Sequence, residues 1–295
     1  MKVKYYRIGT RGILFSFEEP YLTNVYVILG KKTVFVLDTF LGPKAMKIVK
    51  KVVKDYSSGQ NKFVVFNSHA DYDHFWGNQS FQDSDIYAHE LAIERIQREG
   101  QNFLRLYEEH QQGKVSLVKP NITFTDQVHF VEEGVLFFYS PGHTQDSISA
   151  YDIIDKVLFV GDNIESPIPY INEANFSQYL STLEDYLNFD AHYIISGHDS
   201  IMTDSFLIES NIQYLKKFAE FSISFQDLPT PKHEATHWTN VVTLAQSLFQ
   251  QRKKDLCSKM LNHADWFLSN VKNDNINVAA ERERISSMLK ILEKN

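Results

Sequence analysis

The chain has 295 residues, 43% of them hydrophobic, and a formal net charge of −7 at pH 7, which suits one large domain or a domain with an appendage. The acidic balance argues against a broad nucleic-acid-binding face, and a single cysteine, Cys257, excludes an internal disulfide and a thiolate metal cluster. Because the apolar runs are far shorter than the ~20 residues of a membrane-spanning helix, and the first residues lack the apolar core of a secretory signal, we expect a cytoplasmic protein without a membrane span.

Short apolar segments open the chain and predict an antiparallel meander. They cover residues 3–8, 13–18, 24–29 and 33–38. Glycine and lysine residues punctuate the turns between them. A helix is expected over residues 43–56, where apolar side chains recur at helical spacing and Pro43 suits the first turn. A strand at residues 62–67 follows.

The loop after this strand has the sequence HADYDH, residues 69–74. Imidazole and carboxylate groups bind zinc, iron or manganese, and so many buried polar groups would repel one another without a cation. The alternative, for this segment alone, is a polar strand-to-helix loop rich in aspartate and histidine. The polar and helical residues 89–118 are expected to form an excursion near the mouth of such a site.

Single metal-capable residues follow later, each on the loop that leaves a strand-like segment. They are His143 after a strand at 134–139, Asp162 after 156–161 and His198 after 192–196. Further strands are expected at 127–131 and 147–152, and a helix at 176–188. A glycine beside each of the three residues lets the backbone turn sharply. Since strand ends at one edge of a layered α/β fold bring distant residues together, the four loops predict one metal site.

The chain changes character from about residue 204. A helical rhythm is broken at the Pro-Thr-Pro segment of residues 229–231 and resumes over 239–270 and 279–292. We therefore divide the chain into a catalytic domain, residues 1–203, and a helical C-terminal extension, residues 204–295. The extension is interpreted as a helical addition that packs on the catalytic domain or joins a homodimer, and the alternative is a lid that sets substrate choice.

The order HADYDH, PGHTQDS, VGDN and SGHD resembles that of the metallo-β-lactamase-fold hydrolases, whose signature is His-x-His-x-Asp-His followed by single His, Asp and His ligands. The resemblance covers residues 1 to about 200 and implies an α/β fold, the four-layer αβ/βα sandwich. It also implies two divalent metal ions, zinc in the first place, with iron or manganese as alternatives. The implied ligands are His69, Asp71 and His143 for one ion, Asp73, His74 and His198 for the other, and Asp162 as the bridge.

One position departs from this signature, because Asp71 stands where the second histidine is usual. Flavodiiron proteins of the same fold carry a glutamate there and bind iron, and oxygen ligands favour iron or manganese. Zinc also accepts mixed nitrogen and oxygen ligands. The alternative for Asp71 is a carboxylate that does not touch the metal and orients His69 through its ring N–H.

The predicted function is hydrolysis of a small-molecule ester, lactone, thioester or phosphodiester by a hydroxide that bridges two metal ions. Asp73 is the candidate catalytic residue, because its second oxygen faces the bridging water in the family that the chain resembles. Glu165 and Tyr170 are candidate substrate-binding residues, with a solvated charge and loop packing as their alternatives. Acyl-homoserine lactonases of this fold carry a tyrosine where Glu165 stands, so that assignment lacks support.

An iron-dependent oxidoreductase of the flavodiiron or persulfide dioxygenase kind is the alternative function. Asp71 favours it, but the segment after residue 204 offers neither the alternating strands and helices nor the phosphate loop of a flavin domain. A binding module with a relic metal site is disfavoured, because every ligand position holds a competent side chain.

The remaining histidines are expected to lie outside the site. His89 stands where a strand passes into a helix, and we expect it to cap that helix or to lie at the surface. Others, such as His237 and His263, have no converging partner in the sequence. A lone histidine is satisfied more often by local hydrogen bonds than by a metal.

Overall fold

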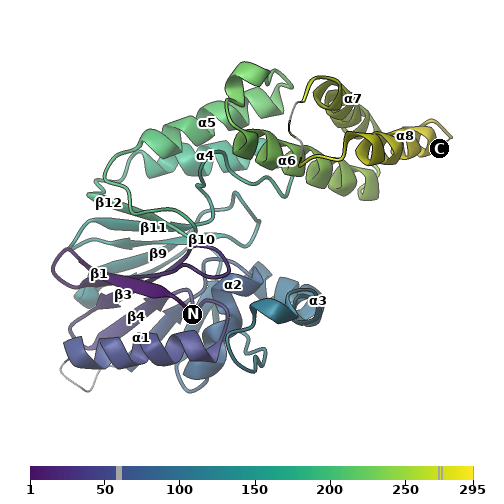
Figure 1. The fold of residues 1–295 in the computed structure, drawn as a ribbon. Helices are drawn as coiled ribbons and strands as arrows, with labels where there is room; N and C mark the ends of the chain where they lie inside the picture. The colour runs from purple at the N-terminus through teal and green to yellow at the C-terminus, as the bar shows by residue number, and fades with distance from the viewer. Residues whose placement is uncertain (58–61, 272, 274, 295) are drawn as a thin grey trace. The chain divides into compact units, whose positions relative to one another are not determined.

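The computed structural model describes residues 1–57, 62–271, 273 and 275–294. They form two compact units, which are described separately below (Figure 1). The first unit comprises Met1–Asn163 and Asp185–Ser205, and the second comprises Ile164–Glu184 and Phe206–Asn295. The predicted division at residues 203 and 204 differs from these bounds, because residues 164–184 group with the C-terminal helices; as a division into domains it stays a prediction.

The first sheet of unit 1 has seven strands, which lie in chain order. They are β1 (Val3–Ile8), β2 (Gly12–Phe17), β3 (Thr23–Leu29), β4 (Thr33–Leu37), β5 (Lys62–Phe66), β6 (Asp85–His89) and β7 (Ile122–Phe124). Strands β1 to β4 pair antiparallel, as the predicted meander requires, and β4 to β7 pair parallel. The strand expected before the HADYDH loop is β5.

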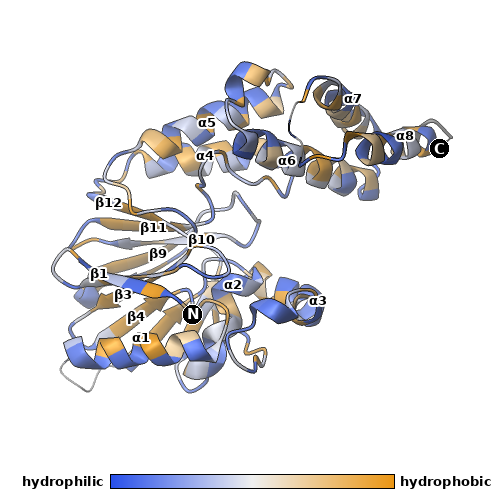
Figure 2. Cartoon of the chain, viewed as in Figure 1, coloured by the Kyte–Doolittle hydropathy of each residue, from blue (hydrophilic) through white to orange (hydrophobic). Residues whose placement is uncertain are grey.

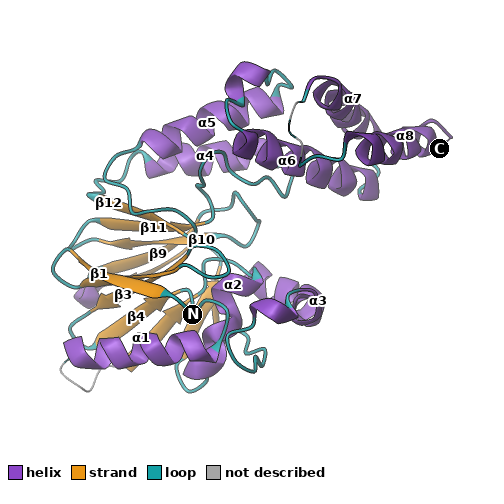
Figure 3. Ribbon diagram, in the orientation of Figure 1, coloured by secondary structure: helices purple, strands orange, loops and turns teal. Residues whose placement is uncertain are grey.

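The second sheet has five strands in the order β12-β11-β10-β9-β8 (Figure 3). They are β8 (Gln127–Phe130), β9 (Val135–Tyr139), β10 (Ile148–Asp152), β11 (Val157–Gly161) and β12 (Tyr193–Ser196). Strands β8 to β11 pair antiparallel, and β11 pairs parallel with β12. All five lie within one or two residues of the predicted segments, because each is an apolar run bounded by turn residues.

Successive side chains of a strand point to opposite faces of the sheet, and this alternation separates two hydrophobic cores in unit 1. Val34 and Val36 of β4 pack with α1 (Pro43–Tyr56), whereas Phe35 and Leu37 of the same strand pack with residues of the second sheet. Figure 1 shows α1 along one face of the first sheet, and Figure 2 shows hydrophobic residues concentrated on the strands. This period-2 alternation builds a helix layer and two sheets from one chain.

Two further helices of unit 1 lie near the HADYDH loop. Helix α2 (Tyr72–Phe75) begins inside that loop and passes into a short 3₁₀ helix, Trp76–Phe81. Helix α3 (Glu90–Leu106) follows β6 and is capped by His89, whose ring nitrogen accepts a hydrogen bond from Leu91 N at 3.3 Å. The predicted cap is therefore confirmed.

The second unit is helical in the part that the structure describes. After α4 (Phe176–Tyr186), whose last residues belong to unit 1, it contains α5 (Phe206–Ala219), α6 (Pro231–Gln250), α7 (Lys254–Asn270) and α8 (Val278–Lys294). The predicted helix start at residue 239 is wrong, because α6 begins at Pro231. The side chain of Thr230 accepts a hydrogen bond from His233 N, so the Pro-Thr-Pro segment is a helix cap with proline in the first turn. Among the described residues, no helix is both long and apolar enough to cross a membrane.

Candidate metal centre

Loops at the ends of four strands of unit 1 carry the candidate ligands. The loop after β5 carries His69 and Asp71 and continues into α2, which carries Asp73 and His74. His143, Asp162 and His198 follow β9, β11 and β12, respectively. The structure brings all seven together in two groups, within each of which the ligand atoms lie within 4.8 Å of one another. The groups are His69, Asp71, His143 and Asp162, and Asp73, His74 and His198.

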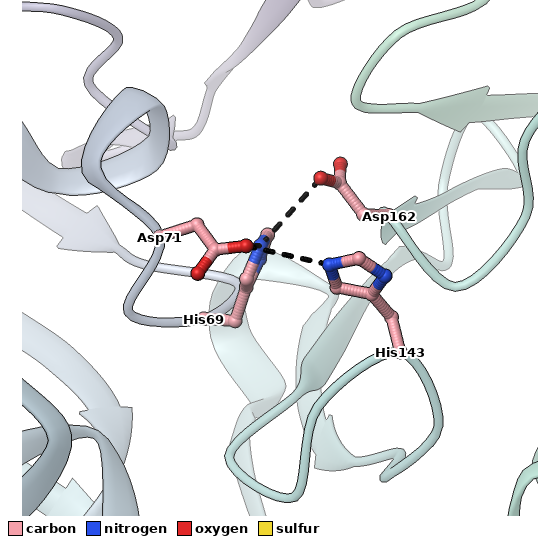
Figure 4. A group of neighbouring side chains, drawn as sticks. All are labelled: His69, Asp71, His143 and Asp162. Carbon is pink, nitrogen blue, oxygen red and sulfur yellow. Dashed lines mark hydrogen bonds and ion pairs between the residues drawn. The ribbon is translucent and has the colours of Figure 1, made fainter. Parts of the chain in front are cut away.

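Two histidines of the first group approach one carboxylate oxygen of Asp71, and Asp162 lies on the other side of His69 (Figure 4). Asp71 Oδ2 lies 3.2 Å from His69 Nε2 and 3.4 Å from His143 Nε2. Asp162 Oδ2 lies 3.5 Å from the same His69 nitrogen. Two imidazoles and two carboxylates therefore face a common centre from three separate loops.

Asp162 also reaches the second group. Its Oδ2 atom lies 3.2 Å from His74 Nε2 and 3.1 Å from His198 Nε2. Asp73 Oδ2 approaches the same His198 nitrogen at 3.4 Å. A single oxygen of Asp162 thus contacts imidazoles of both groups, which is the place that a bridging ligand would take.

Buried atoms without partners support a metal ion at this position. His69 Nε2, His74 Nε2 and Asp162 Oδ1 are buried, and no hydrogen bond reaches them from the described residues. Leaving a buried polar atom unsatisfied costs about 1–3 kcal/mol, and three such atoms lie together here. Imidazole nitrogen and carboxylate oxygen are the donors that zinc, iron and manganese accept, so the residues fit a metal ion.

Hydrogen bonds on the outer side of two rings aim the imidazoles at the centre. His198 Nδ1 lies 2.7 Å from the carbonyl oxygen of Leu22, and a carbonyl only accepts, so Nδ1 carries a proton and Nε2 is the nitrogen that a metal ion could bind. His74 Nδ1 lies 2.7 Å from Asp38 Oδ2 and is fixed in the same way. Both rings present Nε2 to the centre.

The charges in the cluster call for a cation. Burial opposes ionisation of Asp162, but the neighbouring imidazoles outweigh it and hold the pKa of Asp162 well below its usual range. Burial lowers the pKa of His198, but the charges of Asp162 and Asp73 raise it to about 10. The carboxylates therefore draw protons onto the imidazoles, and a divalent ion would supply the same positive charge in place of those protons.

Arg95 of α3 is a site residue that the sequence analysis missed. Its guanidinium forms an ion pair with Asp71 Oδ1 and lies 3.3 Å from Asp146 Oδ1. Burial opposes ionisation of Asp71, but the charges of Arg95 and His69 hold the pKa of Asp71 well below its usual range. One arginine on an amphipathic helix gives no signal in the sequence, although the excursion that carries it was expected near the site.

The geometry argues against the alternative role of Asp71. An orienting carboxylate would contact the outer ring nitrogen of His69, but that Nδ1 atom lies 3.0 Å from Ser68 Oγ. Asp71 instead approaches Nε2, the nitrogen that faces the centre. As a metal ligand, Asp71 remains a prediction that this position supports.

A chain of hydrogen bonds leads away from Asp73. Tyr21 donates its hydroxyl hydrogen to Asp73 Oδ2 at 3.1 Å or to Tyr72, whose hydroxyl oxygen lies 2.6 Å away. Tyr72 in turn lies 3.0 Å from His110 Nδ1. This run of hydrogen bonds could not be predicted from a local pattern, because Tyr21 lies 52 residues from Asp73.

Two glycines allow the loops to approach one another. A Cβ atom on Gly197 would lie 2.0 Å from Asp162 Oδ1. Gly161 has a φ of +54°, and a Cβ there would lie 2.8 Å from Ser68 Cβ. The expected need for glycine is confirmed at these two positions, for close approach at Gly197 and for a left-handed backbone at Gly161.

The candidate substrate-binding residues lie in the second unit. Tyr170 N donates a hydrogen bond to Glu165 Oε2 at 3.0 Å, and Glu165 N donates one to Asn211 Oδ1 at 3.0 Å. Glu165 is buried, whereas Tyr170 is 38% exposed. The picture of Glu165 as a solvated charge is wrong for that reason, and the substrate-binding role of both residues stays a prediction.

His237 and His263, which have no converging partner in the sequence, meet each other in the structure. Their Nε2 atoms lie 3.1 Å apart in the interior of the helical unit. They stand on α6 and α7, 26 residues apart, so their meeting depends on how two helices pack and leaves no local pattern in the sequence.

Comparison with known proteins agrees with this fold. The family model of the metallo-β-lactamase superfamily matches residues 19–198. Among solved structures, the metallo-β-lactamase TMB-1 has 17% sequence identity and a TM-score of 0.59, covering 74% of this chain and 99% of that one. The metallo-β-lactamase from Hirschia baltica has 18% identity and a TM-score of 0.59, covering 73% and 98%. These likenesses confirm the predicted α/β fold.

One curated relative has a description that differs from those of the solved structures. It is avaE of Aspergillus versicolor, provisionally named a transcription factor, with 26% identity over 136 residues. The match covers 42% of this chain, and the chain spans about two fifths of that relative's length, 40%. The family model covers more than half of the chain and includes all seven candidate ligands. The chain belongs to the metallo-β-lactamase superfamily.

Proposed function

We propose that the chain is a metal-dependent hydrolase that binds two divalent ions, zinc in the first place, and cleaves an ester, lactone, thioester or phosphodiester bond of a small molecule. The position of Asp162 carries this proposal. Its Oδ2 atom lies 3.5 Å from His69 Nε2 in the first group and 3.1 Å from His198 Nε2 in the second. A carboxylate in this position can hold two ions beside each other.

Metal ions held by these residues would supply a water of lowered pKa and a positive charge that polarises the oxygen under attack. The residues of the chain orient the ligand side chains. Asp38 and the Leu22 carbonyl fix the rings of His74 and His198. Asp73, next to the centre, can take a proton from the attacking water and return it to the leaving group.

Substrate recognition is assigned, within this proposal, to Glu165 and Tyr170. The hydrogen bond from Tyr170 N to Glu165 Oε2 makes the two residues one structural element. The proposed partners are the small-molecule substrate and a second copy of the chain through the helical unit, with no nucleic acid and no membrane.

A substrate panel tests the hydrolase. The zinc-loaded chain is assayed against an ester, a lactone, a thioester and a phosphodiester. One class should be hydrolysed, and Asp162→Asn should lower its turnover by at least about 100-fold, since loss of partners of metal ligands alone costs 10–100-fold. The matched control is Asp190→Asn, at a carboxylate that is 75% exposed in the same unit. Absence of turnover in all four assays with two ions bound would contradict the proposal.

An iron-dependent oxidoreductase is the second candidate, and Asp71 favours it. Asp71 adds a carboxylate oxygen to the first group, where the usual signature has an imidazole, and oxygen ligands suit iron. Oxygen uptake by the iron-loaded chain with a persulfide substrate distinguishes it from the hydrolase. Uptake without any hydrolysis would place this candidate first.

A further inference from the structure

We propose that Arg95 is the counter-charge of Asp71 and that this ion pair sets the preference of the first ligand group for zinc over harder ions such as manganese. The inference rests on the proposed metal centre and adds to it a residue that determines metal selectivity. It concerns the charge that Asp71 offers to a metal ion, and it makes Arg95 a positioning residue that acts through Asp71.

The two oxygens of Asp71 are divided between the centre and Arg95. Oδ2 lies 3.2 Å from His69 Nε2 and 3.4 Å from His143 Nε2, on the side where the ligand atoms meet. Oδ1 forms the ion pair with the Arg95 guanidinium. The same carboxylate can therefore bind a metal ion with one oxygen and remain paired through the other.

Arg95 restores the charge that the usual signature would give. With histidine at position 71, the ligand set would contain two carboxylates, Asp73 and Asp162; with aspartate it contains three. The positive charge of Arg95 offsets the third. Both side chains are shielded from water, Arg95 at 17% and Asp71 at 23% exposure, so the offset is stronger than it would be in bulk solvent.

Further contacts hold the guanidinium in place. Arg95 Nε lies 3.1 Å from Glu99 Oε2 one turn along α3, and Nη1 lies 3.3 Å from Asp146 Oδ1. Asp146 Oδ2 accepts a hydrogen bond from Ala70 N at 2.7 Å, within the HADYDH loop. The planar fork of arginine thus ties α3 to the loop that carries Asp71, which the single ammonium group of lysine cannot do with the same geometry.

A carboxylate paired with a guanidinium is a weaker donor than a free one. Removing Arg95 leaves Asp71 with its full charge, and anionic oxygen ligands favour manganese and iron over zinc more strongly than imidazole does. Loss of Arg95 should therefore shift the preference of the first group towards manganese. The partners of metal ligands act on affinity by about 10–100-fold, so the shift should be measurable.

The test measures the binding of Zn²⁺ and of Mn²⁺, each alone, to the metal-stripped full chain by titration in competition with a chelator. In Arg95→Met the ratio of the two affinities should move about tenfold towards manganese. Arg95→Lys keeps the charge but loses the planar fork, so it should shift the ratio less than Arg95→Met does. The matched control is Arg98→Met on the same helix, where the arginine is 67% exposed and pairs with Glu99.

A double substitution shows whether the effect of Arg95 depends on its ion pair with Asp71. In the Asp71→His background the third carboxylate is gone, so adding Arg95→Met should leave the zinc-to-manganese ratio unchanged. An equal shift in both backgrounds, or no shift in either, overturns the inference. If Arg95→Met does not fold, Arg95→Gln replaces it, because it removes the charge and keeps hydrogen-bond donors. A chain that binds neither ion contradicts the proposed function, whereas unchanged ratios with two ions bound contradict only the role of Arg95.

Discussion

Under the proposed function, Asp73 would serve both as a metal ligand and as the group that takes up a proton. Its Oδ2 atom lies 3.4 Å from His198 Nε2 and 3.1 Å from the Tyr21 hydroxyl. Asp73→Asn keeps the shape and one oxygen but removes the charge that takes up a proton. We expect turnover to fall about 100-fold or more with metal content nearly intact, the range of general acid–base catalysis. The measurement is turnover together with elemental analysis of the same sample. Loss of a metal ion as well would make Asp73 chiefly a ligand.

A substitution of Tyr21, the hydrogen-bond partner of Asp73, tests the role of the same carboxylate. Tyr21→Phe removes the hydroxyl that lies 3.1 Å from Asp73 Oδ2 and leaves the ring in place. We expect turnover to fall about tenfold with both metal ions retained, because the carboxylate loses a partner that orients it. Steady-state kinetics of the metal-loaded variant measure this, with Tyr5→Phe, at a tyrosine that is 48% exposed, as the control. Unchanged kinetics would separate Tyr21 from catalysis.

Helices α5, α6 and α7 are linked by a network of buried hydrogen bonds, called the polar chain below. Asn240 Oδ1 accepts a hydrogen bond from Ile171 N, so its Nδ2 donates to the Tyr214 hydroxyl at 3.2 Å. The Tyr214 hydroxyl lies 2.9 Å from His237 Nδ1, and His237 Nε2 lies 3.1 Å from His263 Nε2. Burial favours the neutral form of both imidazoles.

This polar chain predicts an acid-sensitive helical unit. Burial lowers the pKa of His237 to about 3, with the charge of His263 as a second cause, and burial lowers the pKa of His263 to about 4. The unfolded chain therefore binds more protons below about pH 6.5, and the free energy of unfolding should fall as the pH drops from there. The slope is up to about 1.4 kcal/mol per pH unit for each extra proton.

Urea unfolding at pH 7.0 and pH 5.0, followed by helical circular dichroism, measures this loss. The variant His237→Leu/His263→Leu lacks both groups and should lose less free energy of unfolding between the two pH values than the unsubstituted chain. His192→Leu, at a histidine of the first unit, is the control. An equal loss in all three proteins would contradict the role of the pair.

The elements differ in how far the sequence predicts them. The strands of both sheets carry apolar runs between turn residues, so most could be located within two residues. Strand β7 was missed because its three residues, Ile122–Phe124, are too few to show alternation. The start of α6 was missed because a Thr-Pro pair serves equally as a break and as a helix cap.

Over the whole molecule, the candidate ligands could be predicted and their supports could not. Each ligand follows a strand, and strand ends meet at one edge of a layered fold. Arg95 and Tyr21 reach the centre from positions 24 and 52 residues away from their partners, and no local pattern records such a distance. The helical residues after 198 lie beyond the span of the family model, so their part in substrate choice or dimer formation stays a prediction.

The central claim is that the two ligand groups hold two metal ions. Elemental analysis of the full chain, purified without added metal, counts zinc, iron and manganese per chain. We predict about two divalent ions, zinc foremost, and a fall to at most one in Asp162→Asn. One or two tightly held irons would support the oxidoreductase instead, and a chain that holds no ion and takes up none when zinc is supplied would contradict the account.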